Sequence, residues 1–347
     1  MTPLDTSIIT VNTNERERLV EYLPSVWSSL GNFEVLISDN GSTDGSLEYI
    51  EAHFPKTRIV RNGRNLGFAG ANNRAAAVAT SQILVFLNPD TTVHPRWLLE
   101  LIDPFHDPKV GLTTSKILLM RDPRLLNTCG NNVHLSGLTL CNGMGQPRER
   151  FPIRQEVSAV SGAAFAIRRE LFHELGGFNE SFFIYMEDTT LSIEARLRGW
   201  KCVFNPKSVV YHDYSLRFGP NKILYQERNR YMMLLVVYRW PTLLLLLPAL
   251  LSTEILTWGF VLLRDRKHWA NKFKAYYGIW QNRRLIMAQR RNNQSQRQVT
   301  DRSLIEATTY ALDFQQISTG SLGRISASIF NPVYWLFRTM TLSVIWW

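Results

Sequence analysis

Short apolar runs alternate with amphipathic segments through the first ninety residues of the chain. The runs are rich in β-branched and aliphatic residues and predict buried strands at residues 7–11, 33–38, 57–60 and 83–87. The segments between them have helical spacing and predict helices at residues 15–30, 46–54 and 72–79. Strands that alternate with helices in this way predict an α/β domain with a mostly parallel central sheet.

The pattern weakens in the middle of the chain and changes character after it. Residues 127–145 are rich in Asn and Gly and predict a loop with short strands. Order returns at residues 161–167, and two further strands are predicted at residues 202–204 and 209–211. Beyond these strands the composition shifts to apolar and basic, so we predict a domain over residues 1–238 and a helical region over residues 239–347.

The second region opens with an apolar segment, Trp240 to Leu263, whose one charged residue is Glu254. At about 1.5 Å per residue, a helix of this length could cross a hydrocarbon core of roughly 30 Å. Pro248 and Glu254 weaken that interpretation, although membrane helices tolerate both where neighbouring helices compensate. Whether the segment spans a membrane or lies on it stays open at this point.

Residues 264–291 are basic and aromatic, with nine Lys or Arg against the single acid Asp265. Five aromatic residues share one face of a helix through this segment: Trp269, Phe273, Tyr276, Tyr277 and Trp280. This combination is typical of a helix on a membrane surface. We expect a polar linker at residues 292–303 and a second membrane-contacting segment at residues 329–347. The alternative is a soluble appendage that packs on the domain or forms a dimer.

Charge is distributed unevenly over a chain whose net charge is +10. Residues 1–200 carry −3, whereas residues 201–347 carry +13. A basic surface of this kind attracts nucleic acid or anionic lipid headgroups. The aromatic residues in the basic half are interspersed with Leu-rich runs, which favours lipid over nucleic acid. Cations beside an apolar segment also predict the cytoplasmic face of a membrane.

The cysteine content and the N-terminal residues both indicate an intracellular protein. The three cysteines form no Cys-x-x-Cys pair, and an odd number argues against a disulfide scaffold. Residues 1–6 contain no basic stretch and lead directly into the first strand, so we predict no secretory signal.

Acidic residues follow several of the predicted strands, where ligands bind in α/β domains. Asp39 ends a buried strand and opens the stretch 39–45, so its carboxylate could accept hydrogen bonds from a nucleoside. Asn, Gly, Ser and Asp are also turn formers, and a simple turn is the alternative. We expect at least one of Ser42, Thr43 and Asp44 to cap the next helix.

Two further segments could hold a diphosphate and its counterion. Residues 65–72 carry small side chains before a helix, and exposed N–H groups at that helix start would suit a diphosphate; strand–helix packing is the alternative. Asn88, Pro89 and Asp90 end a hydrophobic strand, and the Asp90 carboxylate would suit Mg²⁺ or Mn²⁺. In the alternative interpretation, Asp90 only caps a helix near Pro95.

Glu187 and Asp188 follow an aromatic run, and such surroundings can raise a carboxylate pKa toward that of a useful base. Adjacent acids at a helix start can also simply complement the helix dipole. His212 follows a predicted strand and is a candidate third metal ligand, although a lone His is more often structural.

Taken in order over residues 6–240, these motifs resemble glycosyltransferase family 2, in particular its rhamnosyltransferase-like branch. The similar segments are residues 8–14, 39–46, 65–69, 87–90, 176–180, 187–188 and 198–200. The resemblance implies a GT-A-type nucleotide-sugar-binding domain. It implies inverting transfer of one sugar, from a dTDP-rhamnose-like or UDP-sugar donor to a hydroxyl of a lipid-linked glycan or cell-surface polysaccharide precursor.

The resemblance also implies roles for individual residues. Asp188 would be the catalytic base, Glu187 would support the acceptor, and Asp90 with His212 would bind Mg²⁺ or Mn²⁺. The expected nucleotide-sugar-binding residues are Val11, Thr13, Asp39, Asn40, Asn65, Gly67 and Asn88. Two positions depart from the family pattern: Thr13 stands where tyrosine is common, and Asn88 replaces the first acid of the metal-binding Asp-x-Asp motif.

Two rival functions are compatible with the same fold. A processive polysaccharide synthase would require a Gln-x-x-Arg-Trp element, which the sequence lacks. A non-catalytic nucleotide-sugar-binding membrane protein would be expected to lose the acids, whereas Asp39, Asp90 and Asp188 are all present. The sequence therefore favours a single-sugar transferase.

Overall fold

The computed structural model describes residues 4–214, 220–316 and 321–347, so the segment expected to lack a secretory signal lies partly outside the described residues. The chain divides into two compact units. The first comprises Met1–Asn131, Cys141–Ala195 and Trp200–Ser215, and the second comprises Asn132–Leu140, Arg196–Gly199 and Leu216–Trp347.

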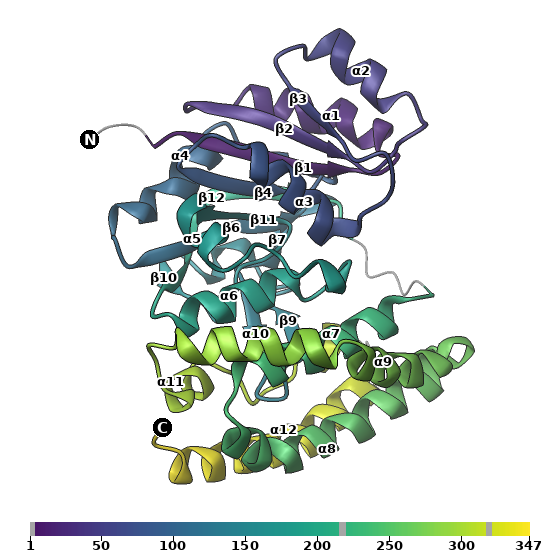
Figure 1. Ribbon diagram of the computed structural model, residues 1–347, viewed down its shortest axis with the longest axis vertical. Helices are drawn as coiled ribbons and strands as arrows, with labels where there is room; N and C mark the ends of the chain where they lie inside the picture. The colour runs from purple at the N-terminus through teal and green to yellow at the C-terminus, as the bar shows by residue number, and fades with distance from the viewer. Residues whose placement is uncertain (1–3, 215–219, 317–320) are drawn as a thin grey trace. The chain divides into compact units, whose positions relative to one another are not determined.

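The first unit is built on one mixed sheet with strand order β10-β12-β6-β11-β4-β1-β2-β3 (Figure 1). Its strands are β1 (Thr6–Asn12), β2 (Phe33–Asp39), β3 (Arg58–Arg61), β4 (Ile83–Leu87), β6 (Val110–Leu119), β10 (Gln155–Glu156), β11 (Ala164–Arg168) and β12 (Lys201–His212). β5 (Thr91–Val93) pairs with β12, and β7 (Asp122–Thr128) pairs with β6. β8 (Asn131–Val133) and β9 (Thr139–Cys141) form a separate pair. The pairs β1–β2, β1–β4, β2–β3 and β6–β12 are parallel, which confirms the predicted mostly parallel sheet.

Helices cover both faces of this sheet. Residues of α1 (Arg16–Trp27), α2 (Ser46–His53) and α4 (Trp97–Ile102) pack in one core cluster, and residues of α3 (Gly67–Val78), α5 (Arg169–Glu174) and α6 (Glu187–Leu197) in the other. Short 3₁₀ turns occupy Asp103–His106, Arg148–Arg150 and Glu180–Phe182. Alternate residues of one strand enter opposite clusters: Ile8 belongs to the first cluster and Ile9 to the second. The central strands are therefore buried on both faces, as their continuous apolar sequences require.

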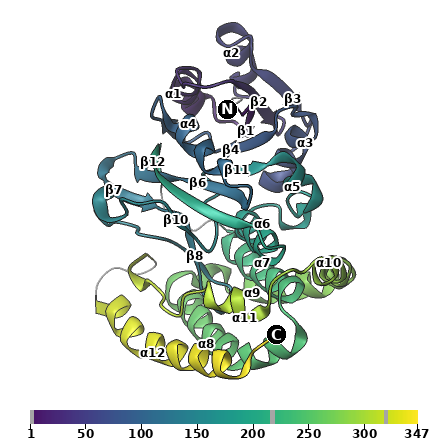
Figure 2. The same cartoon turned by 90° about the vertical axis from the view of Figure 1, so that its left-hand side faces the viewer.

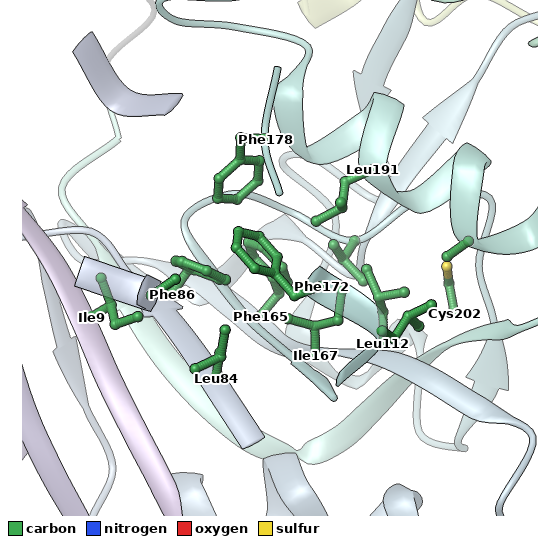
Figure 3. Close-up of a cluster of buried hydrophobic side chains, with 14 of the residues drawn as sticks. Ile9, Leu84, Phe86, Leu112, Phe165, Ile167, Phe172, Phe178, Leu191 and Cys202 are labelled. Atoms are coloured by element: carbon green, nitrogen blue, oxygen red, sulfur yellow. The ribbon is translucent and has the colours of Figure 1, made fainter. Parts of the chain in front are cut away.

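An aromatic cluster holds the loop that leads to α6 (Figure 3). Phe86 of β4 stacks on Phe165 of β11 with ring centroids 5.1 Å apart. The ring of Phe178, in the loop before α6, lies edge-on to Phe86 at 5.0 Å. Burial of these rings thus couples the centre of the sheet to the segment that carries the predicted catalytic acids.

Two predicted boundaries in this unit were wrong. Helix α3 begins at Gly67, five residues before the predicted start at Asn72. The two strands predicted at residues 202–204 and 209–211 are one strand, β12, whose register against β6 shifts between Asn205 and Val209. An irregularity in a continuous strand interrupts the period-two pattern from which strands are predicted.

The second unit is helical and contains α7 (Lys222–Val237), α8 (Trp240–Arg264), α9 (Ala270–Gln281), α10 (Arg283–Ser295), α11 (Asp301–Glu306) and α12 (Ser321–Val344), with 3₁₀ turns at Arg266–His268 and Phe314–Gln316. α7 packs against α9 and α10, and α12 lies along α8 (Figure 2). Helix α7 therefore belongs to the helical unit, whereas the sequence predicted a boundary at residue 238.

In the rest of the C-terminal region, the prediction for the apolar segment holds, whereas those for the basic segment and the linker need correction. The apolar segment is one helix, α8, which is long and apolar enough to cross a membrane by length and composition. The basic segment is two helices that meet at Asn282, not one. The linker predicted at residues 292–303 is shorter than expected, because α10 extends to Ser295 and α11 begins at Asp301.

Candidate active site

The predicted site residues gather at one edge of the sheet in the first unit. Strands β1, β2 and β4 run parallel, and β12 runs parallel to β6, which is antiparallel to β11 as β4 is. The carboxyl ends of β1, β2, β4 and β12 therefore meet at the same edge. Asn12, Asp39 and His212 end three of these strands.

Asp39 is buried, with 2% of its surface exposed, and its carboxylate has partners in the protein. Oδ1 accepts a hydrogen bond from Nδ2 of Asn12 at 2.8 Å. Oδ2 accepts from the backbone N–H groups of Gly41 at 3.0 Å and Ser42 at 3.1 Å. The carboxylate thus shapes the turn after β2, and its contact with a nucleoside stays a prediction.

Asp44 joins the starts of two helices. Its Oδ1 accepts from the N–H of Ser46 in the first turn of α2 at 3.1 Å, and its Oδ2 accepts from the N–H of Arg16 in α1 at 2.9 Å. The residue in the N-cap position of α2 is Gly45, with a φ of 76°. The carboxylate therefore supplies the expected helix-start contact from one residue further upstream.

Asn40 links the loops that follow three strands. Its Nδ2 donates to Oγ1 of Thr13 and to the carbonyl of Gly67, both at 3.3 Å. Its Oδ1 accepts from the N–H of Leu66 at 3.2 Å. Val11 is half-buried near the end of β1. The structure thus brings Thr13, Asn40 and Gly67 together, as a shared nucleotide site would require.

The start of α3 does not offer the exposed N–H groups that the sequence predicted for a diphosphate. Oδ1 of Asn65 accepts from the N–H of Gly67 at 2.8 Å. The carbonyl of Phe183 accepts from the N–H groups of Phe68 at 2.7 Å and Ala69 at 3.3 Å. The prediction was wrong, because Asn65 and a loop distant in the sequence occupy these N–H groups. The contact joins helix and loop, so it also differs from the strand–helix packing given as the alternative.

Gly67 is required by that packing. Its φ is 72°, and a Cβ built on it would lie 2.4 Å from the carbonyl oxygen of Phe183. A side chain at this position would strain the backbone and displace the neighbouring loop. The absence of a side chain at Gly67 therefore lets Phe183 approach the first turn of α3.

Asp90 and His212, the two predicted metal ligands, lie side by side. Oδ1 of Asp90 is 3.3 Å from Nε2 of His212. Strand pairing brings them together, since His212 of β12 is opposite Thr91 of β5. Nδ1 of His212 is 2.8 Å from Oδ1 of Asn127. Because an amide oxygen only accepts, Nδ1 carries the proton of the neutral ring and Nε2 presents its lone pair beside Asp90.

The Asp90 carboxylate fits a cation. Its Oδ1 is buried and accepts no well-aligned hydrogen bond from the residues that the structure describes. Burial raises the pKa of Asp90, but a hydrogen bond and positive charge from a His212 ring that carries both protons, together with the charge of Arg18, hold that pKa below its usual value. A neutral His212 ring instead offers Nε2 to a cation. Helix α4 begins at Trp97 without a side-chain cap, so Asp90 does not serve as its cap.

Two protein ligands are fewer than a divalent ion needs. In the described part of the chain no group of three His, Cys, Asp or Glu side chains could hold a metal. Mg²⁺ and Mn²⁺ commonly complete their six oxygen or nitrogen ligands with water and phosphate oxygens. The pair therefore suits an ion that arrives with a phosphorylated ligand.

Asp188 lies in the first turn of α6, and three hydrogen bonds hold its carboxylate in one orientation. Oδ2 accepts from the N–H of Gly162 at 2.7 Å and from Nδ2 of Asn131 at 3.3 Å, and Oδ1 accepts from the N–H of Thr189 at 2.7 Å. Burial raises the pKa of Asp188, and the donors from Gly162 and Thr189 only partly oppose that effect. A carboxylate with a raised pKa is a stronger base.

Glu187 is buried beside it, and its Oε2 has no hydrogen-bond partner among the described residues. Burial, and then the charge of Asp188, raise the pKa of Glu187. The preceding residues Phe183, Tyr185 and Met186 have φ values of 65°, 71° and 71°. Left-handed conformations at bulky residues are strained and tend to cluster at functional sites.

The acids at residues 187–188 and the loop at residues 88–90 are joined through β11. The N–H of Asn88 donates to the carbonyl of Ala163 at 3.0 Å, and the adjacent Gly162 donates to Asp188. The antiparallel pairing of β4 and β11 thus places the predicted base and the predicted metal-binding loop at neighbouring positions of the same sheet edge.

Several residues that shape this site were missed in the sequence. They share an amide or guanidinium group whose partner is distant in the chain: Asn12, Arg18, Asn73, Asn127 and Asn131. Asn73 of α3, for example, donates to the carbonyl of Phe178 at 2.8 Å and accepts from the N–H of Phe178 at 2.9 Å. The one available signal in the sequence was the position of Asn73, a polar residue within a helix of small residues.

Comparison with known proteins gives one family. The model of glycosyl transferase family 2 matches residues 7–176. An N-acetylglucosaminyl-diphospho-decaprenol L-rhamnosyltransferase of Mycobacterium tuberculosis is 30% identical over 210 residues, which cover 51% of this chain and 66% of that protein. An uncharacterized protein of Sinorhizobium fredii is 32% identical over 201 residues, which cover 54% of this chain and 22% of that protein. The chain thus spans less than two thirds of the length of these curated relatives.

Solved structures share the fold at low sequence identity. GalNAc-T7, solved with UDP, GalNAc and Mn²⁺, has a TM-score of 0.57 at 23% identity and covers 68% of this chain and 48% of its own. The mannosyltransferase PcManGT of Pyrobaculum calidifontis, solved with GDP-Man and Mn²⁺, has a TM-score of 0.52 at 15% identity. The match covers 98% of this chain and 85% of that one. These structures show a GT-A-type fold. The family match and the relative named as a rhamnosyltransferase show that the chain belongs to glycosyltransferase family 2, in its rhamnosyltransferase-like branch.

Proposed function

We propose that this protein is an inverting glycosyltransferase that moves one sugar from a nucleotide-sugar to a hydroxyl group. The donor is dTDP-rhamnose-like or a UDP-sugar, and the acceptor is a lipid-linked glycan or a cell-surface polysaccharide precursor. The observation that carries the proposal is that Asp90 lies beside His212, while Asp188 accepts a hydrogen bond from Gly162, just before the neighbouring strand β11. The family match and the relative named as a rhamnosyltransferase support it.

The donor binds along the carboxyl ends of β1, β2 and β4 in this proposal. The nucleoside lies near Val11, Thr13 and Asp39, and Asn40 keeps the surrounding loops in register. Asn65 and Asn88 flank the diphosphate. The N–H groups at the start of α3 take no part, because Phe183 and Asn65 already occupy them.

Asp90 and His212 would hold Mg²⁺ or Mn²⁺, and Asn127 fixes the His212 ring in the tautomer that leaves Nε2 available. A divalent ion bound there would neutralise negative charge on the diphosphate.

Asp188 acts as the base. It removes the proton from an acceptor hydroxyl, whose oxygen attacks C1 of the sugar from the face opposite the diphosphate. The new C1–O bond forms as the bond from C1 to the diphosphate oxygen breaks, and the electron pair leaves with the nucleoside diphosphate. The donors from Gly162 and Asn131 aim the carboxylate, and Glu187 supports the acceptor.

We place the protein at the cytoplasmic face of a membrane, with anionic lipid rather than nucleic acid as its surface partner. The basic charge of the second half supports this, because each Lys or Arg near anionic lipid contributes about 1 kcal/mol. The relative named for a diphospho-decaprenol substrate supports a lipid-linked acceptor.

The decisive experiment incubates detergent-purified protein with a panel of nucleotide-sugars and Mn²⁺ or Mg²⁺, and measures both donor binding and release of nucleoside diphosphate. Asp188→Asn and Asp90→Ala serve as controls. Metal-dependent turnover of one donor that both variants lose would support the transferase. Donor binding with no turnover in the presence of lipid-linked acceptors would favour a non-catalytic binding protein. Absence of binding to every nucleotide would contradict both.

A further inference from the structure

Helix α8 exposes a continuous apolar face. Its exposed large side chains are Leu244, Leu247, Leu251, Ile255, Leu262 and Leu263. Most are three or four residues apart and therefore share one side of the helix. The most exposed of them reach 70% at Leu244 and Ile255 and 73% at Leu263. Thr242, Leu246, Ala249 and Thr253 are buried on the opposite side.

Helix α12 packs beside α8 and carries a second exposed apolar stripe. Oγ1 of Thr253 in α8 lies 2.9 Å from the hydroxyl of Tyr334 in α12, and the two helices run side by side in both views (Figures 1 and 2). Among its described side chains, the exposed apolar residues of α12 are Ile325, Ile329, Trp335, Leu336, Met340 and Val344. The exposed polar residues are Arg324, Ser328, Thr339 and Ser343. Apart from Trp335, which shares the arc of Ser328 and Thr339, the apolar and polar residues lie on separate arcs, so α12 is amphipathic.

Aromatic residues of α9 adjoin the same face. Trp269, Phe273, Tyr277 and Trp280 are exposed, and the ring of Phe273 contacts that of Trp258 in α8 with centroids 5.3 Å apart. Tyr276, expected among them, instead turns inward and donates to Glu254. We call the exposed apolar residues of α8 and α12 and these four aromatic residues the apolar platform.

Cations surround the aromatic part of the platform. Between residues 264 and 291 the exposed ones are Arg264, Arg266, Lys267, Lys274, Arg283, Arg284 and Arg291. The guanidinium of Arg283 lies 4.3 Å from the ring centroid of Trp280. Tryptophan and tyrosine beside arginine and lysine are typical of the boundary between lipid headgroups and acyl chains.

Buried charges attach the other side of α8 to the protein. Glu254 accepts from Nζ of Lys272 in α9 at 2.9 Å and from Arg230 in α7 at 3.0 Å. Glu227 of α7 pairs with the same Lys272 and Arg230. The one acid of α8 therefore faces the protein. Since one side of α8 contacts protein along its length, hydrocarbon cannot surround this helix as it surrounds a lone membrane span.

We propose that the apolar platform lies flat in one leaflet of an anionic lipid bilayer, so that α8 is an in-plane helix rather than a membrane span. The apolar stripes of α8 and α12 enter the acyl region, and the polar arc of α12 and the cations of α9 and α10 remain among headgroups. This inference rests on the proposed function for its partner, the membrane. It is tested by lipid binding, so its outcome is separate from that of the donor assay.

Flotation of the full chain with vesicles tests the surface. Vesicles of phosphatidylcholine with phosphatidylglycerol should retain the protein, and pure phosphatidylcholine vesicles should retain less. The double variant Leu251→Glu, Ile255→Glu should bind anionic vesicles roughly tenfold more weakly or worse, because two apolar side chains that would enter the acyl region are lost. The matched control Ser328→Glu, Thr339→Glu adds the same charge on the polar arc, where only charge repulsion acts, and should weaken binding less.

Equal binding by the two double variants would overturn the proposal. So would a wild-type protein that ignores vesicles and forms a dimer that only the platform variant dissociates, since the occupant would then be a second copy of the chain. Circular dichroism and donor binding of each variant establish that it is folded.

The in-plane orientation needs its own measurement. Leu244→Cys and Leu262→Cys, each in a Cys141→Ser background, carry a fluorescent label on vesicle-bound protein. A quencher attached to lipids of the outer leaflet alone should reach both labels equally, because both ends of α8 lie in that leaflet. Protection of one end alone would show a span and contradict the proposal.

Discussion

Oδ1 of Asp90, in the turn before β5, lies 3.3 Å from Nε2 of His212, the last residue of β12. The pairing of β5 with β12 places them there, and the N–H of Asp213 reinforces it by donating to the carbonyl of Asp90 at 2.9 Å. A carboxylate oxygen and an imidazole lone pair at this separation can share one cation. The backbone thus assembles the pair before any ligand binds.

Asn127→Ala should weaken Mn²⁺ binding in the presence of nucleoside diphosphate by about tenfold or more. Asn127 holds Nδ1 of His212 at 2.8 Å, and loss of such a partner releases both the ring orientation and the tautomer. Isothermal titration calorimetry measures the affinity, with the exposed Asn32→Ala as control. Equal affinities in both variants would show that Asn127 does not position the ligand.

Gly67→Ala should destabilise the protein and lower its activity, whereas Gly63→Ala should cost less. Both glycines have positive φ values, 72° and 71°, so both substitutions strain the backbone. A Cβ on Gly67 would also meet the carbonyl of Phe183, whereas nothing lies within 4 Å of one on Gly63. Thermal unfolding and donor turnover compare the two. Similar losses in both variants would mean that the packing against Phe183 is unimportant.

Glu187→Gln should raise the free energy of unfolding at neutral pH and make it less dependent on pH. Burial raises the folded-state pKa of Glu187 above its usual value of 4.5. As the pH rises past the unfolded-state pKa, the unfolded chain releases this proton first, so wild-type stability falls. Denaturation at about pH 5 and about pH 8 should show a smaller fall in the variant. Parallel pH profiles would contradict the raised pKa.

Lys272→Met should lower the free energy of unfolding by about 3 kcal/mol, because it leaves Glu227 and Glu254 with less compensating charge in a buried site. Lys274→Met, two residues along the same helix but exposed, should change it by less than about 1 kcal/mol. Chemical denaturation of the two variants provides the comparison. A Lys272 variant as stable as the Lys274 variant would show that the cluster does not anchor α8.

Much of the fold could be predicted because its strands are short, apolar and separated by amphipathic helices. The run Ile83 to Leu87 was predicted with the bounds that the structure shows. The start of α3 could not be predicted, because a tertiary contact sets it: the carbonyl of Phe183 caps the helix. The helix propensity of residues 65–72 does not depend on Phe183, which lies far away in the sequence.

The site divides in the same way. Asp90, His212, Glu187 and Asp188 could be selected because each is an acid or a histidine that follows an apolar or aromatic run. The amides that position them could not, since Asn127 and Asn131 lie in a stretch of Asn and Gly that predicts only a loop. Their significance appears only when the strands bring them to His212 and Asp188.

The central claim is that Asp188 is the base of a sugar transfer. The most direct measurement compares nucleoside diphosphate release by wild type and Asp188→Asn, at saturating donor and metal and with an accepted acceptor. The account predicts that the variant still binds donor but loses transfer by a factor of about 100 or more. Near-normal transfer in a variant that binds donor would contradict it.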